Sequence, residues 1–185
     1  VNDYAGEAPW ADMFIKEFIP HIENEYRIRK QKEFRAISGL SMGVWGALHF
    51  AMNHPDLFVA SAPFSAGVRT DEEMIKIDAD RYQRVYGGLF AKNPQGKERL
   101  NQHYNQFNPL HLARTLPEDR LRSVRWYIDC GDDDFLFEGN SELHVTLRNR
   151  GIPHEYRVRD GAHNWTYWRT GIADALEFIG ESFHR

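Results

Sequence analysis

The fold is decided by the stretch Phe34-Arg35-Ala36-Ile37-Ser38-Gly39-Leu40-Ser41-Met42-Gly43-Val44-Trp45. Its first five residues predict a short buried strand that breaks at Gly39. Residues 42–53 are mostly apolar and predict a helix, which His54-Pro55 should end. Ser41 is therefore expected on the tight turn that joins a strand to a helix.

The turn itself reads Gly39-Leu40-Ser41-Met42-Gly43, which matches the pattern G-x-S-x-G. A serine on such a turn must adopt a strained backbone, and we expect side chains at Gly39 and Gly43 to collide. Five residues of this kind also occur by chance, so the pattern alone could be a turn with an incidental serine. Its place between a buried strand and a helix favours a nucleophile elbow instead.

Further strands and helices alternate along the rest of the chain, which predicts an α/β fold with a mostly parallel sheet covered on both faces. Residues 67–122 change character, being polar and interrupted by Gly and Pro, and we interpret them as an insertion within one domain spanning 1–185. The expected strands are 34–38, 58–62, 125–130 and 155–159, and the expected helices are 9–26 (bent or restarted at Pro20), 42–53, 139–150 and 168–183.

Candidate partners for a serine nucleophile follow two of the later strands. Asp132, Asp133 and Asp134 follow strand 125–130, and His163 follows strand 155–159. Functional groups of open α/β sheets gather at the carboxyl ends of the strands. Spacing alone does not decide which aspartate would orient His163, since acidic residues also cap helices and close turns.

Composition excludes several classes of function. The chain has 185 residues, 23 basic against 27 acidic side chains and a net charge of −4, which gives no field for nucleic acid or an anionic membrane. We accordingly expect no nucleic-acid and no membrane partner. The single cysteine, Cys130, excludes an internal disulfide and a cysteine-based zinc site.

The chain resembles the esterase-D and feruloyl-esterase group of α/β-hydrolases, which also holds S-formylglutathione hydrolases and mycolyltransferases. The matching segments span nearly the whole chain and are jointly more specific than the elbow alone. They are Ser38–Gly43, His54–Phe58, Asn108–Ala113, Asp129–Gly131 with Asp134–Leu136, and Gly161–Trp165 with Tyr167-Trp168.

The resemblance implies an α/β-hydrolase three-layer sandwich and a serine esterase that forms an acyl-enzyme. It implies Ser41 as nucleophile, His163 as base, Asp134 as the acid that orients it, and the backbone N–H of Met42 as one oxyanion-hole donor. Neither a metal nor a cofactor is required. Relatives usually carry further residues ahead of the first helix, so we expect the chain to lack N-terminal strands and the second oxyanion donor.

Substrate choice is expected to lie in the insertion and near His163. Trp165 and Trp168 are candidate substrate-binding residues, because aromatic faces stack on sugar rings and on hydroxycinnamoyl groups. The insertion offers more aromatic residues, although aromatic side chains are mostly core in a chain that holds 14% of them. They are Tyr82, Tyr86, Phe90, Tyr104 and Phe107.

The resemblance favours feruloyl or acetyl esters linked to carbohydrate, either as small molecules or on a polysaccharide. Two alternatives stay open at this point: an acyltransferase in which a sugar hydroxyl replaces water, and a carbohydrate-binding member of the fold without turnover. A polysaccharide substrate would place the protein outside the cytoplasm, secreted or periplasmic. The sequence does not predict the oligomeric state.

Overall fold

The computed structural model describes residues 1–184, and these divide into two compact units. The first comprises Val1–Lys30 and Asp71–Phe107, and the second comprises Gln31–Thr70 and Asn108–Arg185. Residues 71–107 of the expected insertion thus belong to the first unit, and 67–70 and 108–122 belong to the second.

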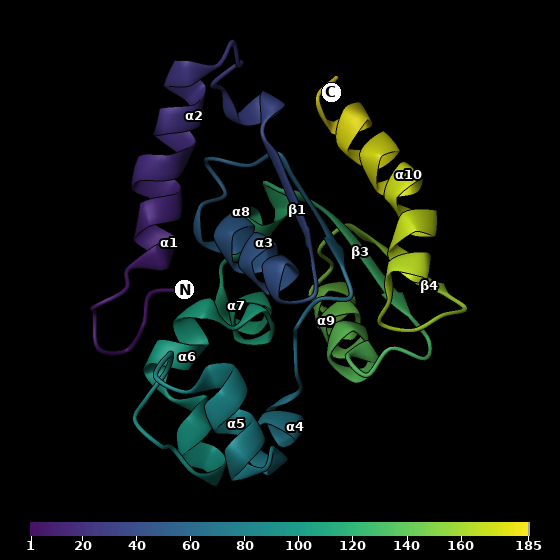
Figure 1. The fold of residues 1–185 in the computed structure, drawn as a ribbon. Coiled ribbons are helices and arrows are strands. Elements are labelled where there is room, and N and C mark those ends of the chain that lie inside the picture. The colour runs from purple at the N-terminus through teal and green to yellow at the C-terminus, as the bar shows by residue number, and fades with distance from the viewer. Residues whose placement is uncertain (185) are drawn as a thin grey trace. The chain divides into compact units, whose positions relative to one another are not determined.

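The second unit is built on a four-stranded sheet in the order β1-β2-β3-β4, in which every neighbouring pair is parallel. This arrangement confirms the predicted α/β fold. The strands are β1 (Ala36–Leu40), β2 (Ala60–Phe64), β3 (Arg125–Gly131) and β4 (His154–Arg159). Figure 1 shows these strands with α3 (Met42–Asn53), α9 (Phe137–Asn149) and α10 (Trp165–Ser182) around them.

Helices cover both faces of this sheet. On one face α10 packs Ala175 and Phe178 against a small-residue surface on β2 and against Tyr127 of β3. Side chains alternate along a strand, so Trp126 points to the opposite face, where its indole donates to the carbonyl of Leu121 in α8 (Glu118–Arg122) at 2.8 Å. The crossover helices α3 and α9 contact β1 with β2 and β3 with β4, respectively.

Two strands run further than the sequence predicts. β1 continues through Gly39 to Leu40, and β2 begins at Ala60 and continues through Pro63 to Phe64. Both predictions stopped at a residue that usually breaks strands. Gly39 and Pro63 lie opposite each other in the β1–β2 register, and the pairing of the two strands continues beyond them to Leu40 and Phe64.

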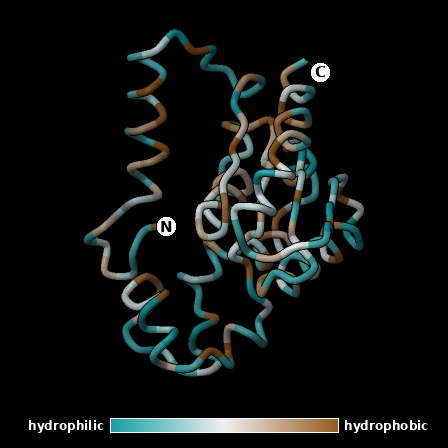
Figure 2. The backbone as a smooth tube through the Cα atoms, turned by 45° about the vertical axis from the view of Figure 1, so that its right-hand side comes forward, coloured by the Kyte–Doolittle hydropathy of each residue, from teal (hydrophilic) through white to brown (hydrophobic). Residues whose placement is uncertain are grey.

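The first unit is helical in the residues described. It holds α1 (Trp10–Met13), a π-helical turn η1 (Phe14–Phe18) and α2 (Ile19–Glu25) within the helix expected over 9–26. The helix α2 has Pro20 in its first turn, which agrees with the expected restart at this proline. Figure 2 shows hydrophobic and hydrophilic residues alternating along this helical segment. The unit also contains α4 (Asp71–Lys76), α5 (Ala79–Tyr86), the 3₁₀ helix η3 (Gly96–Leu100) and α6 (Gln102–Phe107).

Aromatic residues and one buried arginine form the core of the first unit. Tyr82, Phe90 and Tyr104 are each almost fully buried, so these rings serve packing. The guanidinium of Arg99 lies 4.5 Å from the Tyr82 ring centroid and donates to four backbone carbonyls, including that of Met74 at 3.2 Å. A buried charge with several hydrogen-bond partners avoids much of its desolvation cost.

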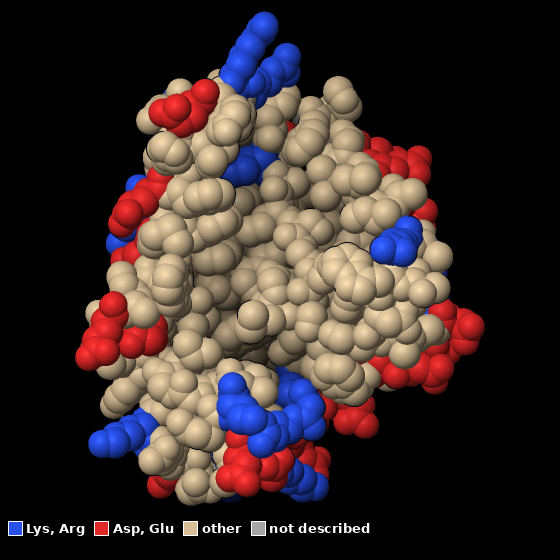
Figure 3. All heavy atoms as spheres, in the orientation of Figure 1, with Lys and Arg blue, Asp and Glu red and all other residues tan. Residues whose placement is uncertain are grey.

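The remaining elements of the second unit are short: η2 (Lys32–Phe34) and α7 (Pro109–Thr115). None of the helices in residues 1–184 is long and apolar enough to cross a membrane. On the face drawn in Figure 3, acidic and basic groups are interspersed, and neither sign gathers into one large patch.

Candidate active site

Ser41 lies on a strained turn at the carboxyl end of β1. Its backbone has φ 55° and ψ −116°, a combination that residues other than glycine rarely adopt. Hydrogen bonds on both sides hold the turn: the Ser41 N–H donates to the Phe64 carbonyl at 3.1 Å, and the Ser41 carbonyl accepts from the Gly67 N–H at 3.0 Å. Strain of this kind persists only where the surroundings fix it.

The two glycines of the elbow differ in what they allow. A Cβ on Gly39 would lie 2.8 Å from the carbonyl carbon of Gly43, so a side chain there would collide as expected. A Cβ on Gly43 would meet nothing within 4 Å outside its own helix, and the expected collision at this second glycine is wrong. The close approach between the strand and the helix thus needs a glycine at the first position.

His163 joins Ser41 to Asp134 within the second unit. Its Nε2 lies 2.9 Å from the Ser41 Oγ, and its Nδ1 lies 2.9 and 3.0 Å from the two carboxylate oxygens of Asp134. The Asp134 side chain is fully buried and that of His163 is largely buried. The three predicted side chains therefore form one continuous hydrogen-bonded chain.

Of the three neighbouring aspartates, Asp134 is the one that contacts His163 in the described structure. Asp132 instead accepts the Gly161 N–H at 3.0 Å, and Asp133 is exposed. Both lie with Asp160 in an exposed acidic group whose oxygens come within 4.8 Å of one another. The Asp134 carboxylate also accepts the Leu136 N–H at 2.9 Å, which closes the turn leading into α9.

Met42 occupies the first position of α3, directly after Ser41. The first N–H groups of a helix have no partner within the helix and favour negative charge. The Ser41 side chain does not cap them. The backbone N–H of Met42 is the first of these groups and directly follows Ser41 in the chain.

Aromatic rings lie on both sides of His163. The Trp168 ring stands edge-on at a centroid distance of 5.0 Å, and the Phe135 ring is 4.6 Å away. Trp165 contacts Trp168 at 5.3 Å and is 62% exposed. The two predicted tryptophans are thus adjacent to the histidine, whereas the sequence reasoning did not single out Phe135.

Two polar residues that hold this region were also not predicted. Ser65, with φ 49°, accepts a hydrogen bond from the Trp168 indole at 2.9 Å, and Asn164 caps α10 by accepting the Tyr167 N–H at 3.0 Å. The cap has a sequence signal, since Asn precedes an aromatic helix start. No pattern marks Ser65.

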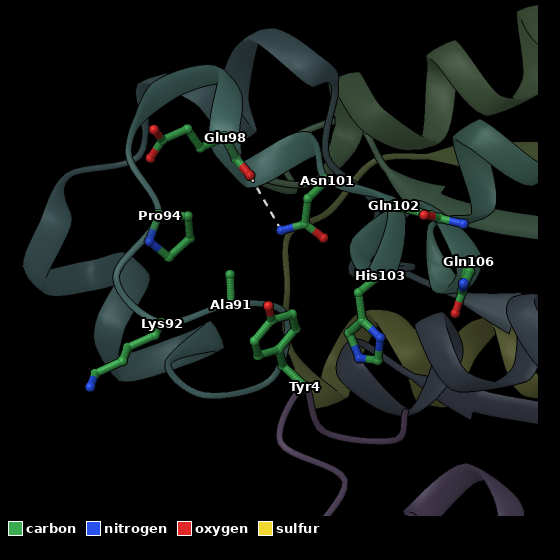
Figure 4. Close-up of a pocket in the computed structure, with 9 residues that line it drawn as sticks. All are labelled: Tyr4, Ala91, Lys92, Pro94, Glu98, Asn101, Gln102, His103 and Gln106. Atoms are coloured by element: carbon green, nitrogen blue, oxygen red, sulfur yellow. Dashed lines mark hydrogen bonds between the residues drawn. The ribbon is translucent and has the colours of Figure 1, made fainter.

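A separate hollow of about 460 Å³ lies in the first unit, beside Tyr4 and His103. In Figure 4 the Asn101 amide donates to the Glu98 carbonyl at 3.2 Å, and the charged ends of Lys92 and Glu98 extend away from His103. None of the predicted site residues lines this hollow. In Figure 4 its polar groups do not converge on one point.

A serine on a strand–turn–helix elbow, hydrogen-bonded to a histidine and through it to an aspartate, defines the hydrolase class of α/β proteins. A family model described as "Putative esterase" matches residues 1–179. The chain belongs to this esterase family, which confirms the resemblance read from its motifs.

Three relatives illustrate the similarity. An acetyl esterase of Caldicellulosiruptor saccharolyticus is 28% identical over 98% of this chain and 67% of its own length. A solved ferulic acid esterase is 33% identical with a TM-score of 0.81, over 99% of this chain and 64% of that one. The fluorophosphonate-binding serine hydrolase F of Staphylococcus aureus, 22% identical with a TM-score of 0.73 over 97% of this chain and 66% of its own, shares the fold.

Proposed function

We propose that the protein hydrolyses carboxylic esters through an acyl-enzyme on Ser41. The observation that carries this proposal is the 2.9 Å contact between His163 Nε2 and Ser41 Oγ, with the opposite ring nitrogen held by Asp134. A serine hydroxyl is a poor nucleophile until a base takes its proton, and the base needs a partner that fixes its tautomer. The contacts of His163 with Ser41 and Asp134 support the proposal.

The reaction proceeds in two halves. Ser41 Oγ attacks the ester carbonyl while its proton passes to His163 Nε2, and the Met42 N–H donates to the oxyanion. The tetrahedral intermediate collapses as His163 returns that proton to the departing alcohol. Water then attacks the acyl-enzyme with His163 again as base, which releases the acid and restores Ser41.

The substrate class we propose is a feruloyl or acetyl ester carried by a carbohydrate. The similarity to a ferulic acid esterase and an acetyl esterase supports this choice. The exposed Trp165 and the rings of Phe135 and Trp168 offer an apolar surface beside His163, on which an aromatic acyl group or a sugar ring would stack. A polysaccharide substrate would again predict export from the cytoplasm.

The test is hydrolysis of methyl ferulate and an acetylated xylo-oligosaccharide by the intact protein and by Ser41→Ala, with acid and alcohol both quantified. We expect turnover by the wild type and none by the variant. Addition of a free sugar acceptor distinguishes hydrolysis from transfer, because an acyltransferase would yield an acylated acceptor in place of the free acid. No turnover on any ester would refute the proposal.

A further inference from the structure

One buried carboxylate of the sheet is not part of the proposed triad. Asp129, on β3, is fully buried, and both of its oxygens are hydrogen-bonded. Oδ1 accepts the Tyr167 hydroxyl at 2.6 Å, and Oδ2 accepts the Tyr127 hydroxyl at 3.0 Å together with the guanidinium of Arg159. Burial of a carboxylate is costly unless it is paired in this way, so we ask what role Asp129 has.

Tyr167 connects this carboxylate to the histidine loop, which we define as residues 160–164 between β4 and α10. The Tyr167 N–H donates to Asn164, the residue after His163, at 3.0 Å. Its ring lies against Gly161, where a Cβ would come within 2.7 Å of the Tyr167 Cδ2 atom. The tyrosine is therefore fixed to the loop at its backbone and ring, and to the sheet at its hydroxyl.

A second connection runs through the main chain of the same aspartate. The Asp129 carbonyl accepts the Ser65 N–H at 2.7 Å, and the Ser65 hydroxyl accepts the Trp168 indole N–H at 2.9 Å. The Trp168 ring then stands edge-on to His163. Asp129 thus reaches both the loop that carries the imidazole and a ring that the imidazole packs against.

The protonation of the two tyrosines suits this arrangement. Burial raises the pKa of Tyr127 to about 12 and raises the pKa of Tyr167 well above its usual range. Both hydroxyls therefore keep their protons at any pH at which an esterase works, and each donates to the carboxylate.

We propose that Asp129 and Tyr167 are positioning residues that hold His163 within reach of Ser41 Oγ. This inference rests on the proposed function, since it assigns what keeps the base in place. The distance between nucleophile and base must be correct to within a few tenths of an ångström, and a misplacement of about 1 Å can lower the rate ~10²-fold. A loop gains such precision from a rigid element, and β3 supplies it here through the buried carboxylate.

The chain offers a matched pair of variants. Tyr167→Phe removes the hydrogen bond that reaches the histidine loop. Tyr127→Phe removes a hydrogen bond to the same carboxylate. The Tyr127 ring packs on Phe64 and Phe178 in the core between the sheet and α10. Each variant keeps its ring and loses one buried O–H. The Tyr127 hydroxyl also accepts from Arg159 at 3.2 Å, so Tyr127→Phe should lose at least as much stability as Tyr167→Phe. Replacement of Asp129 itself would leave several buried donors unmatched and could prevent folding.

The experiment measures kcat, KM, the rate of fluorophosphonate labelling and the thermal midpoint for the wild type and both variants, with 4-nitrophenyl acetate as substrate. For Tyr167→Phe we expect kcat and the labelling rate to fall about 10- to 100-fold with KM within about twofold. For Tyr127→Phe we expect both rates to stay within about twofold of the wild type at an equal or larger loss in thermal midpoint.

Equal rates in Tyr167→Phe and the wild type would overturn the positioning role and leave the proposed function standing. Equal rate losses in the two variants would also overturn it, because the network would then be merely structural. A wild type that neither turns over substrate nor takes the label would refute the proposed function itself, and the positioning role with it.

Discussion

At the scale of single residues, the proposed chemistry rests on the strained Ser41 and the buried Asp134. Ser41 keeps an unfavourable backbone because Phe64 and Gly67 bond to it from a neighbouring strand and its extension. The Asp134 carboxylate is fully buried beside an imidazole and accepts a backbone N–H. Both features have a local energetic cost, and the proposed triad would account for it.

Replacement of Asp134 tests its role against that of its neighbour. Asp134→Asn should lower kcat by about 10³- to 10⁴-fold, because an amide no longer selects the tautomer in which His163 Nε2 is free to accept the serine proton. Asp133→Asn, on an exposed side chain, should leave kcat within about twofold. Steady-state kinetics of both variants checks this, and a loss of activity in Asp133→Asn alone would contradict the assignment.

At the scale of elements, the contact of α10 with the sheet depends on one glycine. A Cβ on Gly171 would lie 2.9 Å from the Phe64 ring and 2.8 Å from the Arg159 guanidinium. A Cβ on Gly180 of the same helix would meet nothing within 4 Å. The helix therefore approaches β2 and the Asp129 network closely at the first position only.

Alanine at these two positions should accordingly change stability in opposite directions. Gly171→Ala should lower the free energy of unfolding by about 1–3 kcal/mol through overpacking. Gly180→Ala should raise it by about 0.5–1 kcal/mol through helix propensity. Urea denaturation measures both values, and a stable Gly171→Ala would show that the helix can move away from the sheet without cost.

His49 on α3 makes the stability of the protein dependent on pH. The side chain is 2% exposed, and burial lowers its pKa to about 3. In the unfolded chain His49 binds a proton below about pH 6.5, whereas in the folded protein it binds that proton only below about pH 3. The free energy of unfolding therefore falls as the pH drops through this window.

The variant His49→Gln isolates this contribution. Between pH 7 and pH 5 the free energy of unfolding should fall by about 2 kcal/mol more in the wild type than in the variant. The slope approaches ~1.4 kcal/mol per pH unit once the histidine of the unfolded chain is protonated. Chemical denaturation at the two pH values checks the difference. Parallel losses in the two proteins would mean that the folded state accommodates the charged imidazole.

At the scale of the whole molecule, the sequence predicted the sheet and its site better than it predicted the first unit. The helix 42–53 agrees residue for residue with α3, because a glycine-rich turn and His54-Pro55 mark its ends. The aromatic residues of the insertion could equally be core or substrate surface, and Tyr82, Phe90 and Tyr104 are core. Periodicity reports that a ring is buried but not what it faces.

Long-range contacts set the remaining limit of the sequence reasoning. Spacing did not decide which of the three aspartates contacts His163. Only the tertiary fold brings one of them, Asp134, to this histidine 29 residues away. The connections from Asp129 through Ser65 to Trp168 have no local pattern at all. Strand-end residues could be predicted as a group, whereas the hydrogen bonds among them depend on the register of the sheet.

The most direct test of the central claim is the intact mass of the protein after treatment with a fluorophosphonate, beside Ser41→Ala and with peptide mapping of the adduct. An activated Ser41 predicts one adduct on the wild type, located at Ser41, and none on the variant. Folded wild-type protein without an adduct, or an adduct that persists in Ser41→Ala, would contradict the account.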